Sequence, residues 1–186
     1  MNNMMHNFAH ELEDELEYEV IAGRWVHIRR IRGAYGESEI ESFDPSPPAP
    51  GTILLTNYPF GGSNPSATHR GIVRRVVAAV IAKMPEAPNI LYCINVDVEG
   101  HEDEVGDPGH FGEVGLARAL KIAELLQKLL EPQIGKLPAA ARRHVNVNVS
   151  TAGPVRPIRS NVTEAGRSMN RRVEIRMSVA PCGPIA

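Results

Sequence analysis

Residues 99–110, EGHEDEVGDPGH, gather carboxylates and imidazoles in one short stretch. Such side chains can bind a metal ion, transfer protons or hold a charged ligand. One hypothesis is the Zn²⁺ or Mn²⁺ site of a hydrolase, made by His101, Asp103 and His110, with Glu102 as the base. The stretch has no HExxH or CxxC spacing, and its two histidines are nine residues apart across a loop with glycines. The residue types alone therefore leave three kinds of site open.

The sequence on either side predicts the elements that position this stretch. Strands are expected where apolar residues alternate, and helices where they recur every three to four residues. The predicted order is strand 52–60, helix 66–85, strand 89–100, helix 111–132, strand 143–153, a short helix or turn at 160–170, and strand 171–180. This order, βαβα-β-(short α)-β, predicts an α/β fold (an α+β sandwich) with a mixed sheet and helices packed on one face.

Each long helix is expected to bury one apolar face. In the first helix, the expected buried residues are Ile72, Val73, Val76, Val77, Val80 and Met84. In the second helix, they are Val114, Ala117, Leu120, Leu125 and Leu129.

Three stretches share their spacing with one known family. They are GHEDEVG at 100–106, VGLARA at 114–119 and NVTEAGRSMNRRVEI at 161–175. Over about residues 52–180 the chain resembles the OmpA-like (OmpA/MotB C-terminal) peptidoglycan-binding family. The motifs of that family read roughly GHTDxxG, a segment with RA, and NxTxxGRxxNRRVEI. The resemblance implies the fold above and a non-catalytic binding role that needs no cofactor or metal.

The ligand that this resemblance implies is peptidoglycan, bound through the diaminopimelate of its stem peptide. The free end of diaminopimelate carries an ammonium and a carboxylate, which suit one acid and one arginine in a partly dry site. By this resemblance, Asp103 takes the ammonium and Arg118 the carboxylate. The first turns of the helix after the loop also offer N–H groups to an anion. The other residues assigned to the ligand site are Gly100, Gly106, Val114 and Arg171.

Three positions depart from the family pattern. The loop Tyr58–Gly61 lacks the acids that the family usually has there, Phe111 replaces an asparagine, and Glu102 replaces a threonine. Asp103 and Arg118 remain. Two interpretations follow: a domain that anchors a protein or an assembly to the bacterial cell wall, and the same fold with weakened or redirected binding.

Simpler roles stay open for the central residues. Asp103 could cap its own turn. Arg118 could be a surface residue of its helix, paired with Glu113 or Glu124. His101 is expected to be a structural residue at the end of its strand.

The flanking charged residues have expected positions as well. Arg171 and Arg172 should face opposite sides of the sheet, so that one lines the site and the other is structural. Glu102, Glu104 and Asp107 are expected to form a solvated acidic rim.

The start of the chain differs in charge from the rest. Residues 1–44 hold ten acidic and four basic side chains, a net charge of −6, whereas residues 45–186 have a net charge of +4. The proline-rich stretch predicts a linker at 45–51 between a separable acidic leader and the OmpA-like domain at 52–180, with a tail at 181–186.

Two patterns stand out in the leader. Phe8, Leu12 and Leu16 recur at helical spacing, which predicts a helix that is either solvated or docked on a protein partner. Val26 and Ile28 alternate with polar residues, which predicts a short strand or hairpin. The acidic, leucine-rich leader is also similar to leaders of proteins that accompany phage-tail-like contractile injection systems. A structural part of such a particle is therefore the alternative function.

Composition limits the remaining classes. The near-neutral charge gives no sign of nucleic-acid binding, and no apolar run approaches the ~20 residues of a membrane span. Cys93 and Cys182 are too few for a disulfide framework, and Cys93 is expected to be a small buried residue. The resemblance implies the cell envelope, whereas the acidic start lacks the apolar core of a secretory signal. Three alternatives follow: assembly in the cytosol, a particle outside the cell, or a mature form whose signal is missing. The oligomeric state stays open.

Overall fold

The structure, a computed structural model, describes residues 14–21, 24–33, 36–43, 45–85, 92–105 and 108–182. The chain forms two compact units, Met1–Pro45 and Ser46–Ala186. The boundary falls inside the proline-rich stretch. The N–H of Ser46 donates to the carbonyl of Pro157 at 2.9 Å, so this stretch is attached to the second unit from its second residue onward.

The first unit contains a three-stranded antiparallel sheet in the order β1 (Asp14–Ile21), β2 (Arg24–Gly33) and β3 (Gly36–Phe43). The strand expected from Val26 and Ile28 is confirmed by β2. The predicted helix is wrong for residues 14–18, because they begin β1 and Leu16 pairs with Arg29. In LEYEVI the apolar residues also alternate with period two, and its tyrosine, valine and isoleucine favour strands. Phe8 and Leu12 lie outside the described residues.

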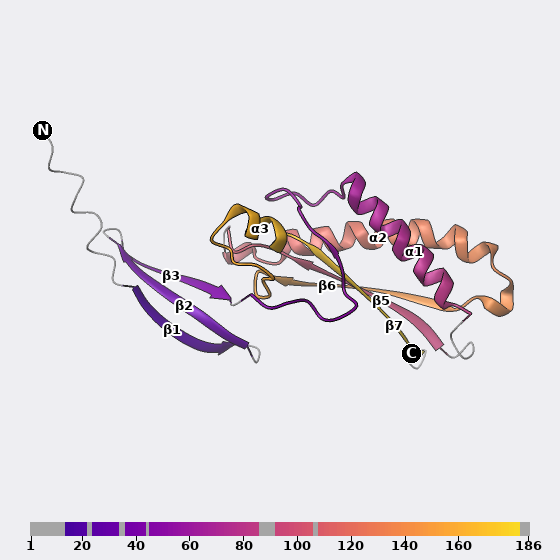
Figure 1. Cartoon of the computed structure of the whole chain (residues 1–186), viewed down its shortest axis with the longest axis horizontal. Helices are drawn as coiled ribbons and strands as arrows, with labels where there is room; N and C mark the ends of the chain where they lie inside the picture. Colours follow the sequence, from indigo (N-terminus) through magenta and orange to yellow (C-terminus); the bar gives the residue numbers. More distant parts are fainter. Residues whose placement is uncertain are drawn as a thin grey trace, which may run out of the picture. The chain divides into compact units, whose positions relative to one another are not determined.

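The second unit is a four-stranded sheet in the order β4-β7-β5-β6, with α1 and α2 on one face (Figure 1). Strands β5 and β6 are parallel, whereas β7 is antiparallel to both β4 and β5. The predicted mixed sheet and order of elements are therefore confirmed. The elements are β4 (Ile53–Leu55), α1 (Ala67–Lys83), β5 (Tyr92–His101), α2 (Glu113–Lys136), β6 (His144–Gly153), α3 (Glu164–Asn170) and β7 (Val173–Pro181), with single 3-10 turns at Pro108–His110 and Ala139–Ala141.

Helix α1 begins and packs as its sequence predicts. Ser66 caps it: its hydroxyl accepts from the N–H of His69 at 3.1 Å, and His69 Nδ1 accepts from the N–H of Ser66 at 3.2 Å. This reciprocal pair satisfies two N–H groups at the helix start. The buried residues of the predicted face are Val73, Val76, Val77, Val80 and Met84, while Ile72 is partly buried.

Helix α2 buries a stripe that is shifted from the predicted one: Leu125 and Leu129 pack against the core and are partly buried, as are Val114 and Ala117. Leu120 is 46% exposed, and the fully buried positions include Gly115, Arg118 and Ala119. A pattern built from hydrophobic residues alone places Arg118 on the solvent side. The predicted buried stripe is therefore rotated about the helix axis relative to the observed one. The structure instead turns Arg118 inward. The complete buried set is Gly115, Arg118, Ala119, Ile122, Ala123, Leu126 and Leu130.

The two cysteines form a disulfide, which corrects the expectation of an isolated buried Cys93. Cys93 is buried at the start of β5, and Cys182 directly follows β7. Their Cα atoms are 4.9 Å apart, although 89 positions separate them in sequence. The antiparallel register of β5 and β7, which pairs Cys93 with Ala180, brings them together. This bond lies at the end of β5 opposite to His101.

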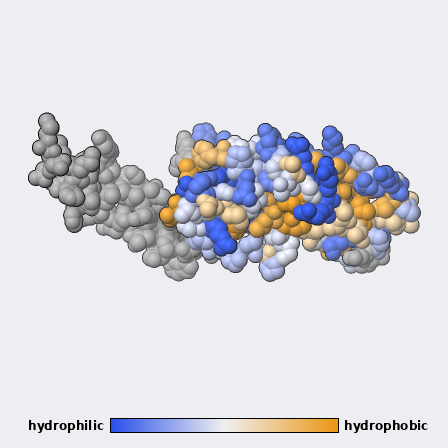
Figure 2. Space-filling model, turned by 45° about the horizontal axis from the view of Figure 1, so that its top comes forward, coloured by the Kyte–Doolittle hydropathy of each residue, from blue (hydrophilic) through white to orange (hydrophobic). Residues whose placement is uncertain are grey.

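The surface of the second unit mixes polar and apolar residues. Figure 2 shows hydrophobic and hydrophilic residues interspersed over one face of it. Among the described residues, none of the helices combines the length and the apolar character needed to cross a membrane.

The disulfide predicts a measurable loss of stability on reduction. Closing a loop of 89 residues restricts the unfolded chain and stabilises the fold by about 2–5 kcal/mol. Urea denaturation of the parent with and without a reductant should show this as a lower midpoint in the reduced protein. The double variant Cys93→Ser/Cys182→Ser should have the urea midpoint of the reduced parent, and the reductant should not change that midpoint. Equal midpoints for the oxidised and reduced parent would contradict the prediction.

Candidate ligand-binding pocket

A small pocket of about 120 Å³ lies where the loop after β5 meets the start of α2. Four of the residues expected in the ligand site line it: Asp103, Val114, Arg118 and Arg171. The full lining is Phe60, Gly61, Glu102, Asp103, Val105, His110, Phe111, Val114, Arg118 and Arg171. The fold thus brings residues from four separate segments to one place. Gly106 lies outside the described residues.

Arg118 is fully buried, which rules out the simpler role of a surface residue paired with Glu113 or Glu124. Its Nε donates to the carbonyl of Gly62 at 2.8 Å, Nη1 to that of His101 at 2.8 Å and Nη2 to that of Pro59 at 3.2 Å. Burial lowers the pKa of Arg118, and the charges of Glu102 and Asp103 oppose that shift. The guanidinium therefore stays charged and joins three backbone segments around the pocket.

Asp103 is buried and forms an ion pair with Arg171, whose Nη1 donates to Oδ2 at 2.7 Å. Arg171 also donates through Nε to the carbonyl of Tyr58 at 2.8 Å and through Nη2 to Glu164. The expected turn-capping contact exists, but it is long, with 3.4 Å between the N–H of Val105 and Oδ1. Asp103 thus has its main bond inside the pocket rather than in its own turn.

Glu102 has a role that the sequence did not indicate. It is buried, and its Oε1 accepts from the N–H of Gly112 at 3.0 Å and from the N–H of Gly115 at 2.6 Å. The solvated rim expected for it is therefore wrong. The N-cap residue of helix α2 is Gly112, whose φ of 98° suits glycine and which has no side chain to cap the helix. Glu102 replaces that cap and occupies N–H groups that were expected to receive a ligand anion.

Gly100 positions the pocket without lining it. A Cβ added at Gly100 would lie 1.8 Å from the carbonyl oxygen of Gly115, so no other residue fits there. Gly115 is also constrained, because its Cβ would lie 2.7 Å from the hydroxyl of Thr151. The two glycines let α2 approach β5 closely enough for Glu102 to reach the helix start.

His101 belongs to a second cluster. It is buried, and its Nε2 lies 3.7 Å from Glu99 Oε2 and 3.6 Å from Glu174 Oε1. Neither ring nitrogen has a hydrogen-bond partner among the described residues. Burial, helped by the charges of Arg172, Arg156 and Arg176, lowers the pKa of His101 to about 2. The imidazole is therefore neutral at ordinary pH, and its role in the fold is structural.

The arginines around this cluster argue against a metal ion. Glu99, His101 and Glu174 are the one group with metal-ligand spacing in the described part of the chain. Both carboxylates are already bound by guanidinium groups: Arg156 and Arg176 hold Glu99, and Arg172 and Arg176 hold Glu174. Three cations around two anions repel a further cation.

The metal hypothesis of the charged stretch is not supported either. His101 faces this cluster, whereas Asp103 pairs with Arg171 in the pocket. His110 is exposed and pairs with Glu113 at 3.0 Å. Arg171 donates to Asp103 in the pocket, whereas Arg172 donates to Glu174 in the cluster around His101. The two side chains therefore point to opposite sides, as predicted.

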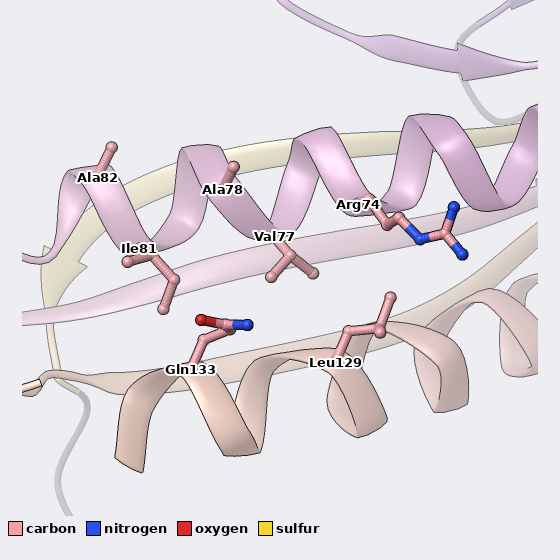
Figure 3. Close-up of a pocket in the computed structure, with 7 residues that line it drawn as sticks. All are labelled: Arg74, Val77, Ala78, Ile81, Ala82, Leu129 and Gln133. Carbon is pink, nitrogen blue, oxygen red and sulfur yellow. The ribbon is translucent and has the colours of Figure 1, made fainter. Parts of the chain in front are cut away.

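A larger open hollow of about 610 Å³ lies between α1 and α2. Figure 3 shows Val77 and Ile81 of α1 pointing toward Leu129 and Gln133 of α2. Among the residues that the structure describes, Arg74 is the one charged residue in its lining, and no carboxylate lines it. Because it lacks an acid, this hollow cannot hold both ends of a zwitterion, and the pocket at Asp103 is the candidate site.

The buried His101 predicts a specific pH dependence of stability. Its pKa of about 2 in the folded protein lies below the usual value of about 6.5, so the unfolded chain binds the proton more readily. Stability should therefore fall as the pH decreases from about 6.5 toward 2. At about pH 5 the parent should lose roughly 2 kcal/mol more than His101→Gln, relative to about pH 7.5. Urea unfolding at both pH values measures this.

The matched control is His144→Gln, since His144 is exposed on β6. This variant should follow the parent. If His101→Gln and the parent lose the same free energy on acidification, His101 is not the group responsible.

Comparison with known proteins gives partial matches, and no family model matches the chain. Outer-membrane lipoprotein YfiB of Pseudomonas aeruginosa is 34% identical over 88 residues, which are 46% of this chain and 46% of that protein. Outer membrane porin F of Pseudomonas fluorescens is 34% identical over 80 residues, 43% of this chain and 21% of that protein. The solved peptidoglycan-associated lipoprotein from Burkholderia pseudomallei matches with a TM-score of 0.49 and 16% identity, over 66% of this chain and 88% of that one.

The chain spans less than half the length of the two curated relatives. Two findings agree with the resemblance drawn from the motifs. The first is the 34% identity to these two outer-membrane proteins. The second is the observed order of strands and helices around a mixed sheet. Residues 46–186 thus have the fold that the resemblance to OmpA-like domains implies.

Proposed function

We propose that this domain binds peptidoglycan without catalysis, through the diaminopimelate of the stem peptide, and so anchors a protein or an assembly to the bacterial cell wall. One observation carries the proposal. A buried carboxylate and a buried guanidinium, Asp103 and Arg118, line the same small pocket beside a second guanidinium, Arg171. A zwitterionic ligand end needs both signs of charge within one partly dry site.

The hydrogen-bonding capacity of the pocket supports this assignment. A guanidinium has five N–H groups, and Arg118 uses three of them on backbone carbonyls, which leaves two for a ligand carboxylate. Asp103 has carboxylate lone pairs beyond its bonds to Arg171 and to the N–H of Val105. Asp103 would therefore accept from the ammonium while Arg118 donates to the carboxylate.

The rim of the pocket suits the rest of such a ligand. Phe60, Val105, Phe111 and Val114 line it with apolar surface, and Phe60 is 64% exposed. These side chains can contact the methylene chain behind the zwitterion. The departures at 58–61 and at Phe111 thus replace polar contacts by apolar ones and leave the charged floor intact.

Other functions have less support. The residues of the hydrolase hypothesis fall into separate clusters, as His101 and Asp103 show. The role in a contractile injection particle, and a protein partner for residues 1–44, stay predictions that rest on the leader alone. One curated relative is, by its name, an outer-membrane lipoprotein, which agrees with a role in the cell envelope.

A pull-down with purified insoluble peptidoglycan tests ligand and site together. Asp103→Asn removes the charge that holds the ammonium, and loss of one partner in a desolvated pair costs on the order of 2–5 kcal/mol of binding free energy. Binding should therefore weaken by roughly 30-fold or more. Because Asp103 is buried in an ion pair, and not at an exposed rim, the variant should also be less stable. Its fold must be checked by circular dichroism.

The matched control is Asp97→Asn on β5, outside the pocket. The Asp97 carboxylate accepts from Asn148 Nδ2 at 2.8 Å, so the control makes the same chemical change in another polar contact. It should bind the wall as the parent does. A folded Asp103→Asn variant that sediments with peptidoglycan like the parent would show that the site is elsewhere.

A further inference from the structure

The carboxylate of Glu102 is a fixed negative charge in the wall of the pocket. Glu102 is buried, and both of its hydrogen bonds, from Gly112 and Gly115, end on Oε1. Among the described residues, Oε2 accepts no hydrogen bond. The pocket therefore contains an acceptor with an unused oxygen beside Arg118.

The charges that line the pocket sum to zero because of Glu102. Glu102 and Asp103 carry negative charges, and Arg118 and Arg171 carry positive ones. An uncharged residue at position 102, such as the threonine of the family pattern, would leave a net charge of about +1. Glu102 also occupies the start of α2, where N–H groups and the helix dipole would otherwise attract an anion.

We infer that Glu102 sets the charge preference of the pocket: its negative charge offsets the attraction that the arginines exert on a free carboxylate, so that the pocket also binds a diaminopimelate end whose carboxylate is amidated. The inference rests on the proposed function. A free carboxylate that reaches Arg118 is repelled by Glu102 and Asp103. A carboxamide is neither repelled by these acids nor attracted as an ion by Arg118 and Arg171, and its oxygen still accepts from Arg118. Its NH₂ group can donate to Oε2 of Glu102.

Displacement of the full-length protein from insoluble peptidoglycan tests this preference. The competitors are two synthetic stem tripeptides that end in meso-diaminopimelate, identical except that one has the free carboxylate and the other the carboxamide. The measured quantity is the ratio of the dissociation constant for the free form to that for the amidated form. Both forms should displace the parent, and an amidated form that does not displace it overturns the inference without need of any variant.

Glu102→Gln removes the charge and keeps the shape. Its side-chain carbonyl can still accept from Gly112 and Gly115, so the start of α2 stays capped. A unit charge within about 7 Å of the ligand carboxylate, at effective dielectric constants of about 20 to 80, changes affinity roughly 3- to 50-fold. The ratio should therefore fall by that factor in Glu102→Gln.

Glu131→Gln is the matched control, since Glu131 is exposed near the far end of α2 and does not line the pocket. It should keep the ratio of the parent. An equal ratio in the parent and in Glu102→Gln, with both proteins bound to the wall, refutes the role of Glu102 and leaves the proposed function intact. A parent protein that does not bind the wall at all refutes the proposed function itself, and the inference with it.

Discussion

The guanidinium of Arg118 joins the segments that form the pocket. It comes from α2, and it donates to Pro59 and Gly62 of the loop after β4 and to His101 at the end of β5. These three bonds are between a charged donor and neutral carbonyls, which are stronger than ordinary hydrogen bonds. A buried arginine without them would be costly, so the loop after β4, the end of β5 and the helix must keep their relative positions. The geometry of the site follows from that requirement.

Arg118 can reach those carbonyls only because α2 lies close to β5. Gly100 and Gly115 allow that approach, and Glu102 fixes the start of the helix by accepting from its first N–H groups. On the other side, Arg171 links Asp103 to the carbonyl of Tyr58. The pocket is therefore held from both sides by charged groups whose partners are mostly backbone atoms. Such a site is largely formed before a ligand arrives, which lowers the entropy cost of binding.

Sequence patterns predicted the order of elements in the second unit, because alternation and helical periodicity are local signals. The family resemblance implied that Asp103 and Arg118 share one site, and both line the pocket. The sequence patterns failed where partners are distant. The disulfide of Cys93 depends on the pairing of β5 with β7, which no local pattern contains. The cap supplied by Glu102 comes from ten residues before Gly112. Leu16 shows a third limit, since a short segment can satisfy helical and strand periodicity at once.

The division into two units has a consequence for spectroscopy. Trp25, the only tryptophan, lies in β2 of the first unit, whereas the pocket belongs to the second. Tryptophan fluorescence, excited at wavelengths that tyrosine does not absorb, therefore reports on the first unit and not on the pocket. Phe60 is the natural place for a second fluorophore, because it is 64% exposed and lines the pocket. A Phe60→Trp protein, with Trp25→Phe to remove the background, would turn ligand occupancy into an optical signal.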